Sequence, residues 1–395
     1  MTSVVLGELI REAKAGFASG KRDDAGVIQL RMNNVDTNGG ITWNSFLRVP
    51  ADPDAVTEYQ LRPGDVLFNN TNSTALVGKS ALFTRHDEPV VYSNHFTRLR
   101  THEDKLLPSY LASWLSHQWA SGVFAEICNQ WIGQSAVQAG KLLALSMRLP
   151  PLAEQVRIVA ELTASMATVE KARLAAEARL AAAEALRVAY IDESLQVADC
   201  STVKLGDCLT EVRTGVGEAW KHYPVLGATR AGLAPAKEAI GKHPERYKPV
   251  GADTVFYNPM RILLGSIAYV DGVAHEGITS PDYVVFRGTP GQVDSLWFYE
   301  WFRSQRGKEL ILSLSRGAVR ERILFNRLAE GEIVLPPYRA QVAAADNIRR
   351  ANRLFPAMLD QLAKIEALPA ALLREVFGDT EAENTALNAD PLSHH

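Results

Sequence analysis

The stretch that decides the fold begins Leu149-Pro150-Pro151-Leu152-Ala153-Glu154-Gln155 and continues to Leu195 with no further Gly or Pro. A proline pair fits the approach to a helix or its first turn, and the run of Ala, Glu, Leu and Arg that follows favours a helix throughout. At about 1.5 Å per residue, this helix would extend for roughly 60 Å. Such a length exceeds that of an average globular helix, so we expect the rest of the chain to be organised around it.

A seven-residue repeat runs along one face of this predicted helix. The repeating positions are Leu162, Val169, Ala176, Ala183 and Tyr190. The residues between them are only partly apolar, so the face is a narrow, alanine-rich seam. A seam of this kind suits close packing against one partner helix better than burial in a thick core.

The expected partner helix lies in the same chain. Leu335-Pro336-Pro337-Tyr338-Arg339-Ala340-Gln341 repeats the opening phrase 186 positions later. A second apolar stripe follows it, formed by Ile348, Phe355, Leu359, Leu362, Ile365, Leu372 and Val376. Pro356 and Pro369 are expected to kink or interrupt this helix. The residues predicted to pack the two helices together are Leu162, Val169, Ala176, Ala183, Leu359, Leu362 and Ile365.

The segments that precede the two helices follow one plan. In the first, we expect strands at 27–32, 59–61, 66–68, 77–83 and 96–99, a helical region at 106–128 and a loop at 131–135. Similar phrases recur in the second segment in the same order and at nearly one offset, at 203–209, 253–258, 264–269, 280–287 and 297–302. We interpret this as a tandem duplication of a globular domain and a long helix.

The predicted fold class is therefore α+β, with two mixed α/β domains in tandem separated by two long antiparallel, coiled-coil helices. The predicted boundaries are 1–148 for the first domain, 149–199 for the first helix, 200–334 for the second domain, 335–378 for the second helix and 379–395 for a disordered tail.

Composition restricts the possible functions only loosely. The chain has 395 residues and a net charge of −3, with the acidity concentrated in the helices and the tail. Charge alone therefore does not indicate nucleic-acid binding. No apolar run approaches the length of a membrane span, the start has no signal peptide, and Cys128, Cys200 and Cys208 are unpatterned. We expect a cytoplasmic protein with reduced thiols and no membrane association.

Catalytic signatures are missing or degraded. Leu335-Pro336-Pro337-Tyr338 lacks the polar first residue that an amino-methyltransferase motif needs, and Asn258-Pro259-Met260-Arg261 lacks its second proline and its aromatic residue. There is no phosphate-binding glycine loop and no His or Cys spacing typical of zinc. We therefore predict no catalytic residue and no metal site.

Binding features are stronger. In the first domain the candidates for DNA contact are Asn69, Asn70, Thr71, Asn72, Ser73, Lys79, Trp131, Gln134 and Ser135. In the second domain they are Lys221, Arg230, Asn258, Arg261, Arg316, Arg320 and Arg322. Amide and guanidinium groups can bond base edges in pairs or bridge to phosphates. The competing interpretations are a solvated polar loop, an arginine-bearing surface neutralised by Glu321, and a core position for Trp131.

The whole pattern resembles the specificity subunits of type I restriction–modification systems. The phrases that carry the resemblance are Leu149 to Val159 and its repeat from Leu335, Gly64 to Phe68, Ser280 to Phe286, and Gly317 to Leu335. The resemblance as a whole covers about residues 4–377, essentially the entire chain. The second copy departs from the pattern at Arg339-Ala340-Gln341, which replaces Ala-Glu-Gln, and at Pro356 and Pro369.

The resemblance implies a non-catalytic subunit in which each domain is a target-recognition domain that reads one half of a split double-stranded DNA site. The helices would set the spacing between the halves and dock two methyltransferase subunits. S-adenosylmethionine would be bound by those subunits and not by this chain, and restriction (translocase) subunits could join the complex. The alternatives are a coiled-coil scaffold with two protein-binding domains, which predicts no sequence-selective DNA protection, and a lone methyltransferase or nuclease.

Overall fold

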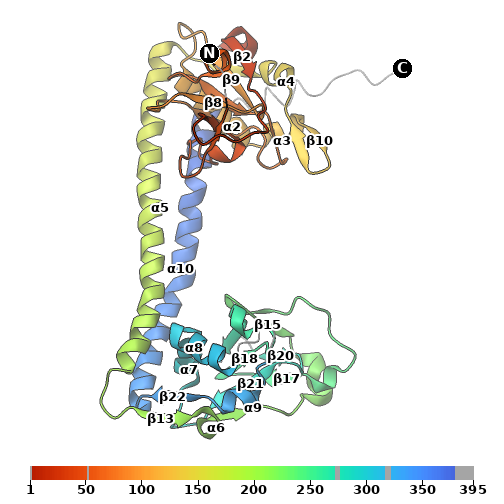
Figure 1. Ribbon diagram of the computed structural model, residues 1–395, viewed down its shortest axis with the longest axis vertical. Helices are drawn as coiled ribbons and strands as arrows, with labels where there is room; N and C mark the ends of the chain where they lie inside the picture. The colour runs from red at the N-terminus through yellow and green to blue at the C-terminus, as the bar shows by residue number, and fades with distance from the viewer. Residues whose placement is uncertain (1, 51–52, 272–275, 316–321, 379–395) are drawn as a thin grey trace. The chain divides into compact units, whose positions relative to one another are not determined.

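The structure is a computed structural model that describes residues 2–50, 53–271, 276–315 and 322–378. The chain divides into two compact units. Unit 1 takes in the residues up to Ala175 and those from Leu362 onward, and unit 2 takes in Ala176–Gln361. Two long helices, α5 (Leu152–Ser194) and α10 (Tyr338–Phe377), each contribute one half to either unit (Figure 1). Each unit thus pairs the beginning of one helix with the end of the other, which is the antiparallel order predicted from the sequence.

Unit 1 is built on small antiparallel sheets. Its strands are β1 (Thr2–Val5), β2 (Ile10–Ala15), β3 (Val27–Leu30), β4 (Leu47–Val49), β5 (Val66–Asn69), β6 (Thr71–Asn72), β7 (Ser80–Leu82), β8 (Val90–Tyr92), β9 (Phe96–Thr101), β10 (Asn129–Trp131), β11 (Gln134–Ala136) and β12 (Ser146–Leu149). Its shorter helices are α1 (Pro53–Tyr59), α2 (Pro108–Ala120), α3 (Val123–Ile127), α4 (Ala139–Leu143) and the 3-10 helices η1 (Leu6–Glu8) and η2 (Met32–Asn34). Strands β3 and β8 form the parallel pair in an otherwise antiparallel arrangement.

Unit 2 has a similar inventory. Its strands are β13 (Ser201–Lys204), β14 (Leu209–Glu211), β15 (Leu226–Thr229), β16 (Gly232–Pro235), β17 (Lys248–Val250), β18 (Thr254–Tyr257), β19 (Ile267–Val270), β20 (Gly277–Thr279), β21 (Val284–Gly288) and β22 (Glu332–Leu335). Its shorter helices are α6 (Leu205–Cys208), α7 (Ser295–Arg303), α8 (Gln305–Leu314), α9 (Phe325–Ala329) and the 3-10 helices η3 (Gly217–His222), η4 (Pro244–Arg246) and η5 (Ile262–Leu264).

The sheet topology confirms the predicted duplication. Unit 1 contains a four-stranded sheet in the order β2-β9-β5-β7, and unit 2 contains one in the order β14-β21-β18-β19. In each unit the first strand also pairs antiparallel with the strand that precedes the long helix, β1 with β12 and β13 with β22. A helix follows the four-stranded sheet in both, α2 and α7, and the buried Trp114 and the buried Trp301 are each the seventh residue of their helix. The predicted α+β fold class is correct.

A buried glutamine holds the turn at Pro150-Pro151, where strand β12 leads into helix α5. The side-chain amide of Gln155 donates to the carbonyl oxygens of Pro150 (2.9 Å) and Lys105 (2.8 Å) and accepts from the backbone N–H of Leu107 (2.9 Å). This side chain is fully buried. It satisfies backbone groups that the strand-to-helix turn leaves without a partner, and so fixes the direction in which α5 leaves the domain.

Gln341 repeats this arrangement in unit 2. Its amide donates to the carbonyl oxygens of Pro336 (2.8 Å) and Gln292 (2.9 Å) and accepts from the backbone N–H of Asp294 (3.0 Å). The side chain is again fully buried. The glutamine survives in the second copy although the glutamate before it does not, because only the glutamine bonds to the domain.

The seam predicted on α5 is present. Leu162, Ala176 and Ala183 are buried, and Val169 and Tyr190 are half-buried, while the residues on the opposite face are exposed. In unit 2 the seam meets α10 at Ala344, Ala345 and Ile348, which share a core cluster with Ile191 of α5. Small side chains let the two backbones approach closely there.

The second helix corrects two expectations. Helix α10 runs without interruption through Pro356 and Pro369, so an interruption at these prolines is wrong, and a kink there stays a prediction. Each proline lacks the backbone N–H of one helical hydrogen bond, and the helix nevertheless continues on both sides of it. Leu359, predicted to pack between the helices, is 52% exposed, whereas Leu362 and Ile365 are half-buried. Leu359 lies off the buried face because Phe355, Met358, Leu362 and Ile365 already fill the inward positions there.

Shorter elements also differ from expectation. Tyr59 ends helix α1 and is not in a strand, because Pro53 starts a helical turn just upstream. The helical region 106–128 is split in two at Gly122, whose φ is +84°. Residues 131–135 belong to a β-hairpin instead of an irregular loop. The predicted disordered tail, 379–395, lies outside the described residues.

Candidate nucleic-acid interface

In unit 1 the two polar stretches singled out from the sequence form one sheet. Strand β6 pairs with β11, which places Asn72 opposite Ser135 and Thr71 opposite Ala136. Strand β11 pairs in turn with β10 through a tight hairpin. The hydroxyl oxygens of Thr74 and Ser135 lie 2.7 Å apart. Segments 69–74 and 129–136, separated by more than fifty residues of sequence, therefore present a single surface.

Two of the predicted contact residues are part of the interior of this surface. Asn69 is fully buried; its amide donates to the carbonyl oxygens of Thr71 (3.1 Å) and His95 (2.9 Å) and accepts from the amide of Asn72 (2.7 Å). Ser135 is also buried. Both side chains use their hydrogen-bonding groups to shape the loop, so in this structure they are not available to a ligand.

Lys79 likewise does not reach the surface. The positive φ of Gly78 (+91°) turns the chain inward, and the ammonium group of Lys79 donates to the carbonyl oxygen of Val35. Burial lowers the pKa of Lys79, against the opposing effect of Asp36. A buried lysine bonded to backbone is not placed to neutralise phosphate. Sequence reasoning missed this because a lysine in a polar loop is normally solvated.

The accessible groups of the surface are amides, hydroxyls and apolar side chains. Ser73, Trp131 and Gln134 are exposed. Asn70, Thr71 and Asn72 are half-buried, and their polar groups are held in fixed directions: the Thr71 hydroxyl donates to the amide oxygen of Asn70 (2.7 Å), whose nitrogen donates to the Thr97 hydroxyl (3.1 Å). Ile132 and Gln130, which the sequence analysis did not select, are exposed beside Trp131. The sequence Trp131-Ile132-Gly133 could have indicated this exposed apolar pair, since a glycine after two large apolar residues suggests that they lie at a turn.

In unit 2 the predicted arginines gather around the loop that follows β18. Arg261 is exposed in that loop, and its backbone N–H donates to the carbonyl oxygen of Asn258 (3.0 Å). The backbone bond from Ile323 to Pro259 (3.2 Å) brings the exposed Arg322 to the same loop. Arg230 joins them beside Gly265, since a Cβ at Gly265 would lie 3.6 Å from its Cγ. Three cations from separate segments thus lie near one strand end.

Of the other candidates in unit 2, Asn258 lies in the same loop, Lys221 lies on η3, and two fall outside the described residues. The amide oxygen of Asn258 accepts from the backbone N–H of Met260 (3.0 Å), so it shapes the loop. Arg322 lies 3.5 Å from a carboxylate oxygen of Asp282, which offsets part of its charge. Lys221 is exposed on η3, with its ammonium 5.8 Å from the ring centre of Trp220. Arg316 and Arg320 fall outside the described residues.

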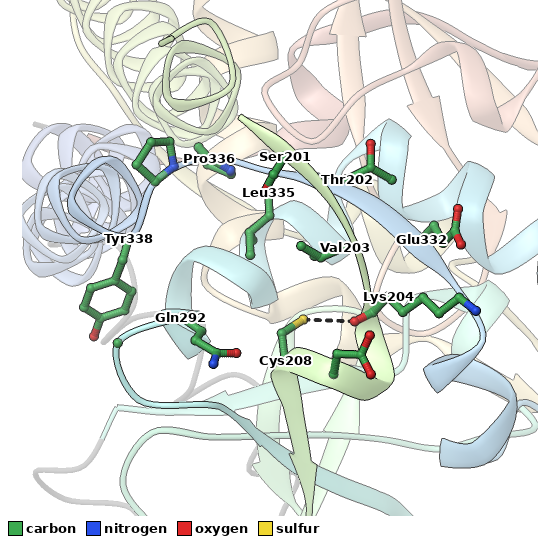
Figure 2. A pocket seen from close by; sticks show the side chains of 13 residues that line it. Ser201, Thr202, Val203, Lys204, Cys208, Gln292, Glu332, Leu335, Pro336 and Tyr338 are labelled. Carbon is green, nitrogen blue, oxygen red and sulfur yellow. Dashed lines mark hydrogen bonds between the residues drawn. The ribbon is translucent and has the colours of Figure 1, made fainter. Parts of the chain in front are cut away.

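A recess of about 710 Å³ opens in unit 2 beside the start of α10 (Figure 2). Strands β13 and β22 form one wall, and Tyr338, Gln292 and Cys208 line the rest. Burial raises the pKa of Cys208 to about 11, and its thiol donates to the carbonyl oxygen of Lys204 (3.5 Å). The thiol is therefore protonated at neutral pH and is a poor nucleophile.

Two absences hold for the residues that the structure describes. Among them, no group of three or more His, Cys, Asp or Glu side chains is arranged to hold a metal ion. None of their helices combines the length and the apolar character needed to cross a membrane.

Comparison with known proteins gives relatives at the levels of sequence and fold. No protein-family model matches the chain. Over 142 residues it is 29% identical to a protein of Methanocaldococcus jannaschii assigned as the specificity subunit of the MjaX type I restriction enzyme. That match covers 36% of this chain and 33% of the relative, so it spans about a third of the curated protein.

Solved structures extend the likeness to nearly the whole chain. A chain from a structure of a type I restriction–modification system superposes with a TM-score of 0.66 at 17% identity and covers 95% of this chain and 96% of its own length. The HsdS subunit of Thermoanaerobacter tengcongensis gives a TM-score of 0.52 at 17% identity with the same coverage. At these identities the likeness shows the fold. The resemblance predicted from the sequence is therefore confirmed.

Proposed function

We propose that this chain is the DNA-recognition (specificity) subunit of a type I restriction–modification complex. Each unit reads one half of a split double-stranded site, and α5 and α10 determine the number of unread base pairs between the halves. The chain itself does no chemistry. Its amides, hydroxyls and arginines select the DNA, and partner subunits modify it.

The repeated helix anchor is the observation that carries this proposal. Gln155 and Gln341 attach equivalent domains to two long helices by the same set of hydrogen bonds. A chain that presents two versions of one scaffold with different surface loops is suited to reading two different short sequences. The loops of unit 1 offer amides and hydroxyls, and that of unit 2 offers arginines, so the two half-sites are expected to differ.

The partners follow from this assignment. Two methyltransferase subunits bind this chain, carry S-adenosylmethionine, and methylate the N6 of one flipped adenine in each half-site. Restriction subunits join the same assembly in a complete system. The low net charge of this chain (−3) supports a need for such partners, since a neutral recognition surface holds DNA weakly by itself.

The test is to co-express the chain with methyltransferase subunits of a type I system that form a complex with it, and to map N6-methyladenine by single-molecule sequencing. We expect a split motif that disappears when this chain is omitted. Exchanging residues 1–148 for those of a relative is expected to change one half of the motif and leave the other half and the spacer unchanged. An intact complex that adds no methylation would contradict the proposal and favour the scaffold alternative.

A second experiment tests the helices as a spacer. Inserting seven residues into α5 and seven into α10 at facing positions preserves the heptad seam. The number of unread base pairs is then expected to increase while both half-sites stay the same. An unchanged spacer in the methylation map would show that the helices do not set the distance.

A further inference from the structure

The hairpin β10–β11 carries an exposed apolar tip that neither the fold nor amide-based recognition explains. Ile132 at the turn is 106% exposed, and Trp131 beside it is 61% exposed. All seven tryptophans of the chain fall within the described residues, and Trp131 alone among them is exposed. Gly133 completes the turn with a φ of +79°.

The base of the same hairpin is held firmly. Strand β11 pairs with β6, and the backbone N–H of Val137 donates to the carbonyl oxygen of Asn70 (2.9 Å). On the other strand, the ammonium of Lys141 donates to the carbonyl oxygen of Ile127 (2.7 Å) and to the side-chain oxygen of Asn129 (3.1 Å). These contacts fix the base of the hairpin, so its apolar tip projects from the domain in a defined direction. An irregular loop could instead fold the same side chains onto the protein surface.

We propose that Trp131 and Ile132 enter the base stack of the half-site read by unit 1 and open one base step. This inference rests on the proposed function. The projection is two strands wide, about 5 Å between strand axes, which is narrow enough to enter a groove. Apolar side chains that wedge between base pairs and unstack them are an established way of binding deformed DNA.

The surroundings of the tip favour DNA over a protein partner. The exposed amides of Gln130 and Gln134 flank it, and Ser73 and the fixed amides of 70–72 lie on the adjoining strand. A stable protein interface buries roughly 800 Å² on each partner, whereas this tip offers only two apolar side chains inside a polar collar. The collar can bond base edges next to the opened step, and the planar indole ring can stack on an exposed base.

The wedge adds specificity without hydrogen bonds. Pyrimidine–purine steps unstack most readily, so the step beneath the tip is expected to be TA, CA or TG. The half-site read by unit 1 then contains a preference at a position that no polar side chain contacts. This preference depends on the tip and not on Asn70–Ser73.

The test uses the complex of the full chain with its methyltransferase, and duplexes that carry 2-aminopurine at successive steps of the half-site identified by exchanging 1–148. For the wild-type complex, 2-aminopurine fluorescence should increase at the flipped adenine and at one further step of the half-site, the step that the wedge opens. The double variant Trp131→Ala/Ile132→Ala should lose the increase at that further step, keep the increase at the flipped adenine, and bind the duplex about 10- to 100-fold more weakly. Trp131→Phe keeps an aromatic ring and should retain most of the fluorescence increase at that step and most of the binding affinity. Phe46→Ala removes an exposed apolar side chain elsewhere in unit 1 and should change neither the fluorescence nor the affinity.

A pre-opened duplex separates a wedge from a simple contact. An abasic site or mismatch at the sensitive step should bring the double variant to within about threefold of wild-type affinity, since the opening has already been made. If the wild-type complex binds its site and the double variant matches it in affinity and fluorescence, the wedge is overturned and the proposed function stands. If the wild-type complex shows no selective binding at all, both are overturned.

Discussion

Units 1 and 2 attach the long helices through equivalent glutamines, Gln155 and Gln341, but the other contacts that hold the helices differ between the units. In unit 1 the end of α10 is held by apolar packing: Phe377 is buried, with its ring centre 5.4 Å from that of Tyr110 and 5.7 Å from that of His117. In unit 2 the helices are held by charge as well. Arg187 of α5 bonds both carboxylate oxygens of Glu300 (2.7 and 2.9 Å), and Arg349 of α10 lies 3.4 Å from Asp294.

This difference shows which contacts a duplicated domain must retain. The glutamine satisfies three backbone groups in fixed directions, and no other side chain of its size offers the same donors and acceptor. Apolar or ionic contacts have looser geometric demands, so they could diverge between the copies. The two attachments are therefore expected to respond differently to mutation, salt and pH.

The largest expected effect is in unit 1. Phe377→Ala should lower the free energy of unfolding of this unit by about 3 kcal/mol, because it removes a buried ring and leaves a cavity against α2. Native-state hydrogen exchange, read separately for the amides of the two units, measures the loss. Val376→Ala is the matched control, since Val376 is the exposed neighbour. Equal loss from both variants would contradict the apolar attachment.

The glutamines test what the units share. Gln155→Ala and Gln341→Ala each leave three backbone groups without their partner, so each should cost its own unit about 2–3 kcal/mol. The same exchange measurement applies. Gln361→Ala, at an exposed position of α10, should change little. A large loss for one glutamine and none for the other would show that the anchor is not equivalent in the two copies.

Most of the fold could be predicted from the sequence because it depends on periodic signals. The proline pair and the run without Gly or Pro that follows it predicted a helix over 149–199, and α5 spans Leu152–Ser194; the repeated proline phrase predicted the duplication and α10. The continuity of α10 through Pro356 and Pro369 could not be predicted, since it depends on tertiary packing that outweighs the loss of two backbone hydrogen bonds. The exposure of Leu359 was missed for a related reason: spacing alone does not say which of several apolar residues faces the partner.

For the candidate site, the sequence predicted which segments take part but not which side chains are exposed on the surface that they form. Segments 69–74 and 131–135 do form one surface, but no sequence rule could say that β6 pairs with β11. Asn69 and Lys79 are buried because the chain turns back at Gly78. The sequence alone does not distinguish a polar side chain that bonds the backbone from one that contacts a ligand. Ile132 was missed because an apolar residue at a turn is normally folded inward.

The ion pair of unit 2 should have a smaller effect that depends on salt. Glu300→Gln leaves the guanidinium of Arg187, which is only 25% exposed, without its charged partner. We expect a loss of about 1–2 kcal/mol in unit 2 at low salt and less at 1 M salt. Glu161→Gln removes an exposed partner of Arg157 on the same helix and should leave stability unchanged. A loss that does not vary with salt would indicate a packing effect instead.

The smallest effect, and the one that separates the units most clearly, is the sign of the pH dependence. In unit 1, burial acts to raise the pKa of Glu12, but the hydrogen bonds and charges of Arg98 and Arg100 outweigh it and hold this pKa below its ordinary value of 4.5. In unit 2, burial raises the pKa of Asp294 above its ordinary value of 3.8, although the backbone N–H of Trp297 and the charge of Arg349 oppose it.

These shifts predict opposite slopes. The stability that Glu12 contributes is present above pH 4.5 and is lost as the pH falls through its folded-state pKa. The contribution of Asp294 is fully present below pH 3.8 and is lost as the pH rises through its folded-state pKa. Between pH 6 and pH 3.5, the advantage of wild type over Glu12→Gln in unit 1 should therefore shrink, while its advantage over Asp294→Asn in unit 2 should grow. Each change should stay below about 1 kcal/mol, because Glu12 is partly screened by solvent and Asn still caps α7. Slopes of the same sign in both units would contradict this prediction and would mean that the two units respond alike to protonation.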